Sequence, residues 1–154
     1  MSTKDHIVVL GGGESGFGAA LLAKRKGHSV FLSDGGTLKD KYKKRLQEEA
    51  IDFEEGGHTE DRVFKASLVI KSPGIPEKAA IVKNIRARNI PIISEVEWAY
   101  RFCKGKVVAI TGSNGKTTTT ILTNHILKNA QLDVAMVGNI GDSFAASVAE
   151  KDHD

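Results

Sequence analysis

The sequence predicts an α/β protein with a Rossmann-like parallel sheet, followed by the beginning of a second α/β unit. Short apolar runs alternate with helical patterns along the whole chain, as in successive βα units. The chain has 16 glycines, and many of them come directly after an apolar run, where ligand-binding turns of such folds lie. An apolar fraction of 40% with 27% charged residues is ordinary for a globular protein of 154 residues.

The first unit is expected to cover residues 1–94, with a linking helix over residues 95–106. Its strands are expected at residues 6–10, 29–33, 52–54, 68–71 and 91–93. Its helices are expected at residues 17–26, 38–50 and 77–88, and Gly27 stands where a helix-ending glycine belongs.

The second unit is expected to begin at residue 107 and to run to residue 154. It starts with an apolar strand at 107–110, continues with a helix to about residue 130, and adds a strand at 134–137 and a short helical pattern. Two strands are too few to bury both faces of a parallel sheet. We therefore expect this second domain to be incomplete and the chain to be the N-terminal part of a longer protein.

A phosphate-binding loop is predicted between the strand at 107–110 and the helix that follows it. Glycines let backbone N–H groups approach an anion closely, and the helix N-terminus adds unpaired donors and a favourable dipole. Lys116 is expected to reach the terminal phosphates of a nucleotide, and the Thr117 hydroxyl to bind Mg²⁺. The expected contacts are Gly112, Ser113, Asn114, Gly115, Lys116, Thr117 and Thr118. The two glycines are closer together than in the general P-loop pattern.

A second glycine-rich turn, Gly11-x-Gly13-x-x-Gly16, follows the first strand and matches a dinucleotide fingerprint. Asp34 ends the second strand, where a ribose-binding acid belongs. The residues alone leave NAD, FAD and a nucleotide sugar open, because glycines at a strand–helix turn favour any diphosphate. A simple glycine turn with a solvated Asp34 is the alternative without a ligand.

Two further turns, Ser72-Pro73-Gly74 and Gly138-Asn139-Ile140-Gly141, also come after apolar strands. Ligands of open α/β sheets bind at the carboxyl ends of the strands. A turn of either kind, taken alone, is more often purely structural than part of a ligand-binding site.

The amino-acid composition indicates which binding partners and which cellular compartment to expect. The net charge is only +3, and the basic cluster at Lys39–Arg45 is expected on a solvated helix face, so no nucleic-acid partner is expected. Cys103 is the only cysteine, which excludes an intrachain disulfide and fits a reducing compartment. No apolar segment approaches the roughly 20 residues of a membrane span, so no membrane insertion and a cytoplasmic location are expected.

Together these stretches resemble the Mur ligases of bacterial peptidoglycan synthesis, from the first strand to about Ala146. The short phosphate loop is typical of the wider superfamily, which includes folylpolyglutamate synthetases. The segments at residues 72–75, 93–97 and 138–141 are most similar to the member that adds D-glutamate.

The resemblance implies a three-domain enzyme that uses ATP and Mg²⁺, and we expect it to be a monomer. Its substrates would be UDP-N-acetylmuramoyl-L-alanine, activated as an acyl phosphate, and D-glutamate. Lys116 would stabilise the transferring phosphoryl group, with Thr117 on Mg²⁺. The implied contacts to the UDP substrate are Glu14, Ser15, Gly16, Asp34, Gly74 and Asn139. Gly35 and Gly36 depart from relatives that carry a hydroxyl and a basic side chain there.

The resemblance also implies that the second Mg²⁺ ligand, a modified lysine, the adenine contacts and the third domain lie beyond Asp154. The 154 residues alone are therefore expected to be inactive.

Three alternatives stay open at this point. The chain could belong to another Mur ligase or to a polyglutamate synthetase. An NAD-dependent dehydrogenase or NAD-sensing domain would explain the turn at 11–16 and Asp34, but not Lys116. A small non-catalytic nucleotide-binding module is disfavoured because its second sheet should be complete.

Overall fold

The computed structural model describes residues 5–151 and contains one parallel sheet of five strands. The strand order is β3-β2-β1-β4-β5, and every neighbouring pair is parallel. The strands are β1 (His6–Leu10), β2 (Ser29–Ser33), β3 (Asp52–Glu54), β4 (Leu68–Lys71) and β5 (Ile92–Ser94). The predicted α/β fold with a parallel sheet is confirmed, and only β5 is displaced, by one residue.

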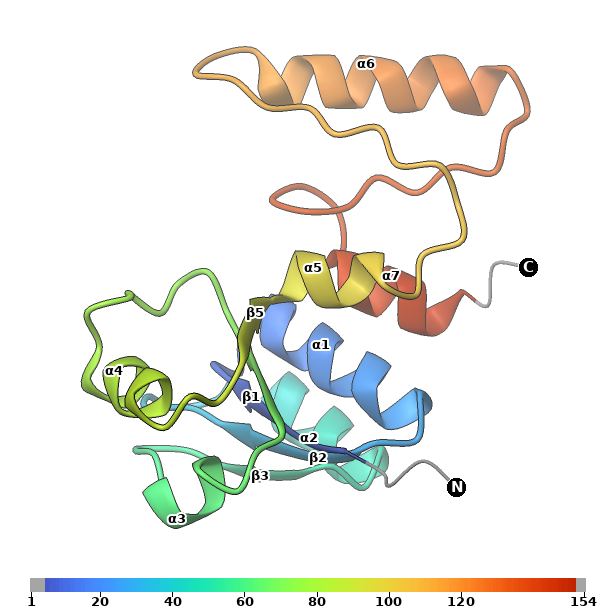
Figure 1. Ribbon diagram of the computed structural model, residues 1–154. Coiled ribbons are helices and arrows are strands. Elements are labelled where there is room, and N and C mark those ends of the chain that lie inside the picture. Colours follow the sequence, from blue (N-terminus) through green and yellow to red (C-terminus); the bar gives the residue numbers. More distant parts are fainter. Residues whose placement is uncertain (1–4, 152–154) are drawn as a thin grey trace.

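Helices cover both faces of this sheet (Figure 1). They are α1 (Glu14–Arg25), α2 (Asp40–Glu48), α3 (Glu60–Val63), α4 (Ala80–Ala87), α5 (Glu95–Tyr100), α6 (Lys116–Asn129) and α7 (Phe144–Glu150). One hydrophobic core joins the sheet to α1, α2, α5 and α7, and a second core joins the other face to α3 and α4. The polar segment of α3 has no apolar periodicity, which is why the sequence did not predict it.

The central strand β1 shows why the sheet is parallel and buried. Val9 faces the core that contains α1, while its neighbour Val8 faces the core that contains α4. Neither residue has exposed surface. A strand that is apolar on both faces fits the middle of a parallel sheet covered by helices on each side.

The helix α1 begins at Glu14, three residues earlier than expected, and Gly27 follows its end with a φ of 85°. The Gly27 N–H donates to the Lys24 carbonyl at 2.9 Å, as the sequence predicted for a helix-ending glycine. Glycines on this helix also allow close packing, because a Cβ atom at Gly18 would lie 2.1 Å from Ser143 Oγ, next to the start of α7.

The helix expected to end near residue 130 is observed as α6, but the two strands expected on either side of it are not. The segments 107–110 and 134–137 form no strands, and Val107 and Val108 are 50% and 67% exposed. A strand needs a neighbouring strand for its N–H and C=O groups, and within residues 5–151 no strand of the sheet pairs with either segment. The only pairing here is a single bridge between Val137 and Asp142.

The two helices of this C-terminal part are packed very differently. No residue of α6 is buried, and Figure 1 shows α6 standing apart from the sheet. Helix α7 instead packs against α1 and α5, and its Ala145 is fully buried in their core. The chain therefore leaves the first unit after α5 and returns to it at α7.

Candidate functional site

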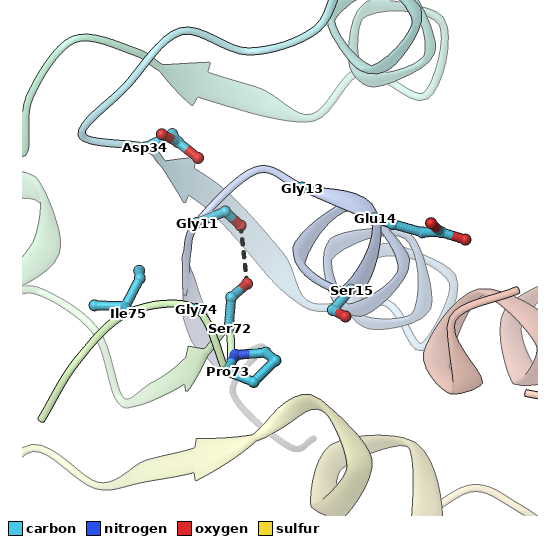
Figure 2. Close-up of a pocket in the computed structure, with 9 residues that line it drawn as sticks. All are labelled: Gly11, Gly13, Glu14, Ser15, Asp34, Ser72, Pro73, Gly74 and Ile75. Atoms are coloured by element: carbon cyan, nitrogen blue, oxygen red, sulfur yellow. Dashed lines mark hydrogen bonds between the residues drawn. The ribbon is translucent and has the colours of Figure 1, made fainter. Parts of the chain in front are cut away.

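A cavity of about 350 Å³ lies at the carboxyl ends of β1, β2 and β4. It sits where the strand order changes direction, between β1 and β4, which is where ligands of open α/β sheets bind. Figure 2 shows its lining residues, which are Gly11, Gly13, Glu14, Ser15, Asp34, Ser72, Pro73, Gly74 and Ile75.

The turn between β1 and α1 brings backbone close to this cavity. Gly11 has a φ of 90°, which disfavours other residues, and its N–H donates to the Ser33 carbonyl at 2.9 Å. Gly13 has no atom within 4 Å of where a Cβ would lie, so it leaves the turn open to a ligand. The first N–H groups of α1 begin just beyond it and have no partners within the helix. Figure 2 shows the Glu14 carboxylate directed away from the glycine turn.

Gly16, expected as a diphosphate contact, does not line the cavity. A Cβ atom at position 16 would lie 1.7 Å from the Gly11 carbonyl oxygen, so only glycine allows α1 to approach the end of β1 this closely. The third glycine of the motif therefore packs the helix against the strand.

Asp34 lines the cavity and also fixes the turns around it. Its Oδ2 accepts from the Gly12 N–H, and its Oδ1 accepts from the Gly36 N–H at 2.7 Å. One carboxylate thus joins the glycine turn after β1 to the turn after β2.

The Ser72–Ile75 loop forms the opposite wall of the cavity. Ser72 Oγ donates to the Gly11 carbonyl at 3.3 Å, a bond drawn in Figure 2. Lys71, whose side chain is 13% exposed, donates to the Ile75 carbonyl at 2.7 Å and pairs with Glu77 at 3.2 Å. Hydrogen bonds from Arg86 and Lys71 hold the pKa of Glu77 below its usual value.

The predicted phosphate loop forms the N-terminus of α6. Gly112 and Gly115 have φ values of 148° and 79°, and Gly115 is the residue that caps the helix. Lys116 begins the helix, and its Nζ donates to the carbonyls of Gly112 and Ser113, at 3.2 Å for Ser113. The ammonium group thus lies against the loop, and Thr117 and Thr118 occupy the exposed first turn. Two left-handed glycines, a helix N-terminus and a lysine on the same loop fit a phosphate group.

The Thr117 hydroxyl is the predicted Mg²⁺ ligand of this loop. Within residues 5–151, no group of three histidine, cysteine, aspartate or glutamate side chains could hold a metal ion.

Asn139 is exposed on the loop between residues 138 and 141 and does not line the cavity. Gly138 has a φ of 116° and donates to the Asp142 carbonyl at 3.0 Å. A Cβ atom at Gly141 would lie 2.2 Å from the Met136 carbonyl oxygen. These glycines therefore serve a tight turn that presents Asn139 to solvent.

Glu95 is a buried carboxylate that the sequence analysis did not single out. It is 6% exposed, and its Oε1 accepts from the Ala145 N–H at 2.6 Å at the start of α7. Burial raises the pKa of Glu95 above its usual value, and hydrogen bonds from Ala145 and Ser143 only partly oppose this effect. Acidic residues are common at helix starts, so no sequence signal distinguished Glu95 from Glu97.

The parallel sheet, the cavity at its switch point and the glycine-rich loop before α6 are features of nucleotide-binding α/β proteins. Two family descriptions match the chain: MurD N-terminal domain over residues 6–81, and Mur ligase middle domain over residues 110–153. The chain belongs to the Mur ligase family.

Curated relatives agree with this assignment. The UDP-N-acetylmuramoylalanine–D-glutamate ligase of Bacteroides fragilis is 55% identical over 149 residues, which is 97% of this chain and 34% of that protein. The protein of the same name from Porphyromonas gingivalis is 53% identical over 150 residues, again 97% of this chain, and 33% of that protein. The chain therefore spans about a third of the length of the curated relatives it matches.

Solved structures show the same fold. A pseudomurein peptide ligase type C from Methanothermus fervidus is 32% identical with a TM-score of 0.58, over 82% of this chain and 26% of that one. A murein peptide ligase from Psychrobacter arcticus is 25% identical with a TM-score of 0.62, over 82% of this chain and 27% of that one. Of the helices within residues 5–151, none has the length and apolar character to cross a membrane.

Proposed function

We propose that the full-length protein is an ATP-dependent ligase that joins D-glutamate to UDP-N-acetylmuramoyl-L-alanine. The observation that carries this proposal is the 55% identity, over 97% of this chain, to a ligase whose name specifies that reaction. The two separate glycine-rich loops support it, because such a reaction needs one site for a nucleotide-linked substrate and another for ATP.

The UDP part of the substrate is assigned to the cavity at the carboxyl ends of β1, β2 and β4. The N–H groups at the start of α1 would bind the diphosphate, helped by the dipole of this helix. Asp34 and Gly74 line the same cavity, on opposite walls. Gly16 contributes by holding α1 close to the strand, and Asn139 would contact the muramoyl part from its exposed loop.

ATP is assigned to the loop that precedes α6. Residues 112–118 would hold its phosphates, with Lys116 beside the transferring group and the Thr117 hydroxyl on Mg²⁺. When bound, ATP and Mg²⁺ supply the phosphoryl group and neutralise its charge. The residues of this chain would position the phosphates through N–H donors at the helix N-terminus. The ammonium group of Lys116 would supply positive charge.

The proposed reaction has two steps. An oxygen of the L-alanyl carboxylate attacks the γ-phosphorus of ATP, the bond to ADP breaks, and an acyl phosphate forms. The amine of D-glutamate then attacks the acyl carbon, loses a proton and expels phosphate, which leaves an amide bond. The first step replaces an oxide ion, a poor leaving group, by phosphate.

We also propose a division of the chain into three parts. These are a UDP-binding unit at residues 1–94, a linking helix at 95–106, and the beginning of the ATP-binding domain at 107–154. We further propose that the enzyme acts as a monomer in the cytoplasm, where ATP and UDP-linked precursors are available. No contact with nucleic acid or membrane is part of this proposal.

Thermal unfolding of the full-length protein with two ligands tests the proposal. UDP-N-acetylmuramoyl-L-alanine at about 100 times its dissociation constant should add roughly 2.7 kcal/mol to the stability, and NAD⁺ should add nothing. The same preparation should release ADP only when D-glutamate is also present. Stabilisation by NAD⁺ alone would overturn the proposal and assign the glycine turn to a dinucleotide.

A further inference from the structure

Three polar side chains form a connected cluster behind the turn that follows β2. Ser33 has no exposed surface, and its Oγ lies 2.6 Å from Glu54 Oε1 and 2.6 Å from His58 Nδ1. Glu54 also accepts from the Thr59 N–H at 2.8 Å and from the Thr59 hydroxyl at 2.5 Å. The cluster joins the ends of β2 and β3 to the loop that carries His58.

The direction of each hydrogen bond in this cluster follows from the carboxylate. Although burial raises the pKa of Glu54, the hydrogen bonds from Ser33 and Thr59 bring it below its usual value, so Glu54 is ionised and only accepts. The single hydroxyl proton of Ser33 therefore points to Glu54. Ser33 Oγ must then accept from His58, which requires the proton on Nδ1.

A neutral imidazole with its proton on Nδ1 has a bare lone pair on Nε2. Within residues 5–151, no hydrogen bond occupies that nitrogen. The Glu54–Ser33 pair, of which Ser33 is buried, thus orients the ring and makes Nε2 a hydrogen-bond acceptor.

The backbone holds His58 beside the turn that begins with Asp34, a residue that lines the cavity. The Gly57 N–H donates to the Asp34 carbonyl at 3.3 Å, and the Gly56 N–H donates to the Gly36 carbonyl at 2.8 Å, so the His58 loop lies along the turn that begins with Asp34. A Cβ atom at Gly35 would lie only 3.2 Å from His58 Nε2. The glycine at position 35 therefore leaves this face of the ring free of a neighbouring side chain.

A nucleotide bound at the glycine turn extends toward the same place. In folds of this kind the diphosphate lies at the first strand–helix turn and the sugar lies near the acid that ends the second strand. The base, which is attached to the far side of the sugar, then reaches the loops that follow β2 and β3. The carboxylates of Asp34 and Glu55 in those loops already accept a hydrogen bond at each oxygen, whereas within residues 5–151 none occupies His58 Nε2.

We propose that His58 is a specificity-determining residue that accepts a hydrogen bond from the imide N–H of a uracil base. The inference rests on the proposed function, since it assumes a uridine nucleotide in the cavity. Uracil presents a donor at N3, whereas cytosine presents an acceptor at the same position. An acceptor on the protein therefore favours uracil and opposes cytosine.

The test compares UDP with CDP as probes, by calorimetric titration of the full-length protein at about pH 8, where an ordinary histidine is neutral. The variant is His58→Asn, because an asparagine NH₂ can still donate to Ser33 while no atom replaces Nε2. Loss of one hydrogen bond to a buried partner should weaken UDP binding about 10-fold to 100-fold. CDP binding should stay unchanged or improve, so the preference for UDP should collapse.

His125→Asn is the matched control, because His125 is an exposed histidine on α6 whose ring is hydrogen-bonded to Asn129 of the same helix. It should leave the binding of both probes unchanged. If His58→Asn weakens the binding of UDP and of CDP equally, or weakens the binding of neither, His58 does not distinguish the two bases. The inference is then wrong, while the proposed function stands. If the wild-type protein binds neither probe, the proposed function fails together with the inference.

Discussion

Lys116 lies at the one point of the phosphate loop where a side chain can bring a positive charge to a nucleotide. It is exposed, and within residues 5–151 its ammonium group donates only to carbonyl groups of its own loop, those of Gly112 and Ser113. Replacing it should therefore affect phosphoryl transfer far more than folding.

For Lys116→Ala in the full-length enzyme, we expect turnover to fall at least about 100-fold, the scale of losing one preorganised donor at a charged transition state. The melting temperature should stay within about a degree, because an exposed side chain is removed. Steady-state ADP release and thermal unfolding measure the two effects. Lys128→Ala, at an exposed lysine of the same helix, is the control, and near-normal turnover of Lys116→Ala would exclude Lys116 from the mechanism.

Asp34 combines a position in the cavity with two hydrogen bonds to backbone N–H groups, those of Gly12 and Gly36. Asp34→Ala should weaken binding of the UDP substrate and leave ATP binding intact. It should also lower the free energy of unfolding by about 1–3 kcal/mol, because the N–H groups lose their acceptor. Binding titrations with each nucleotide and denaturant unfolding test this, and unchanged affinity for the UDP substrate would show that Asp34 lies away from the ligand.

At the scale of helices and strands, the junction between α5 and α7 depends on two neighbouring residues. Ser94 caps α5 by accepting from the Glu97 N–H at 3.1 Å, while Glu95 in the same turn accepts from Ala145 at the start of α7. One short sequence thus begins its own helix and ties a helix almost 50 residues later to the first unit. The Gly138–Gly141 turn lies just before α7, so this junction also limits where Asn139 can lie.

The raised pKa of Glu95 predicts a pH dependence of stability. A carboxyl group with a raised pKa holds its proton more tightly in the native state than in the unfolded chain, whose value is near 4.5. Its favourable contribution is complete below that pH and is lost as the pH rises through the native pKa. Wild type should therefore lose stability relative to Glu95→Gln as the pH rises from about 4.5 to neutrality.

Denaturant unfolding of wild type and Glu95→Gln across this range isolates the effect, because other titrating groups cancel in the difference. Glu95→Ala serves as the contrast, since it removes the acceptor and should cost about 1–3 kcal/mol at every pH. A difference between wild type and Glu95→Gln that does not change with pH would mean that Glu95 titrates normally.

At the scale of the whole molecule, the described chain has a tightly packed part and a loosely packed part. Helix α1 has eight buried residues and lies in the main core, whereas α6 has none. An unsupported helix of 14 residues is only marginally stable in water. Amide protons in the 154-residue chain should therefore exchange at least about 100-fold faster in α6 than in the centre of α1. Equal protection measured by mass spectrometry would contradict this division.

The same loose packing predicts that the 154 residues do not catalyse the reaction alone. Residues 5–151 contain no cluster of three acidic, histidine or cysteine side chains that could hold a metal ion, and the phosphate loop precedes a helix with no buried residue. The purified 154-residue chain should release no ADP in response to D-glutamate, while the full-length protein should. Detectable ADP release from the short chain would show that these residues hold a complete active site.

Much of the first unit could be predicted because its signals are local. An apolar run such as Ile7–Leu10 predicts a buried strand without reference to any other residue, and Gly27 ends α1 through its own backbone freedom. The runs at 107–110 and 134–137 carry the same local signal but form no strands. A strand is stable only when another strand satisfies its backbone, and the neighbour is not a property of the run itself.

The sequence by itself determined the parallel βα framework and the two glycine-rich loops, because these follow from residue type and short spacing. Tertiary structure alone decided that Gly16 serves packing, that Asp34 joins two turns, and that Glu95 and His58 have oriented partners at distant positions in the chain. Those roles depend on which side chains meet after the chain has folded, and hydrogen-bond direction and burial exist only once they have met.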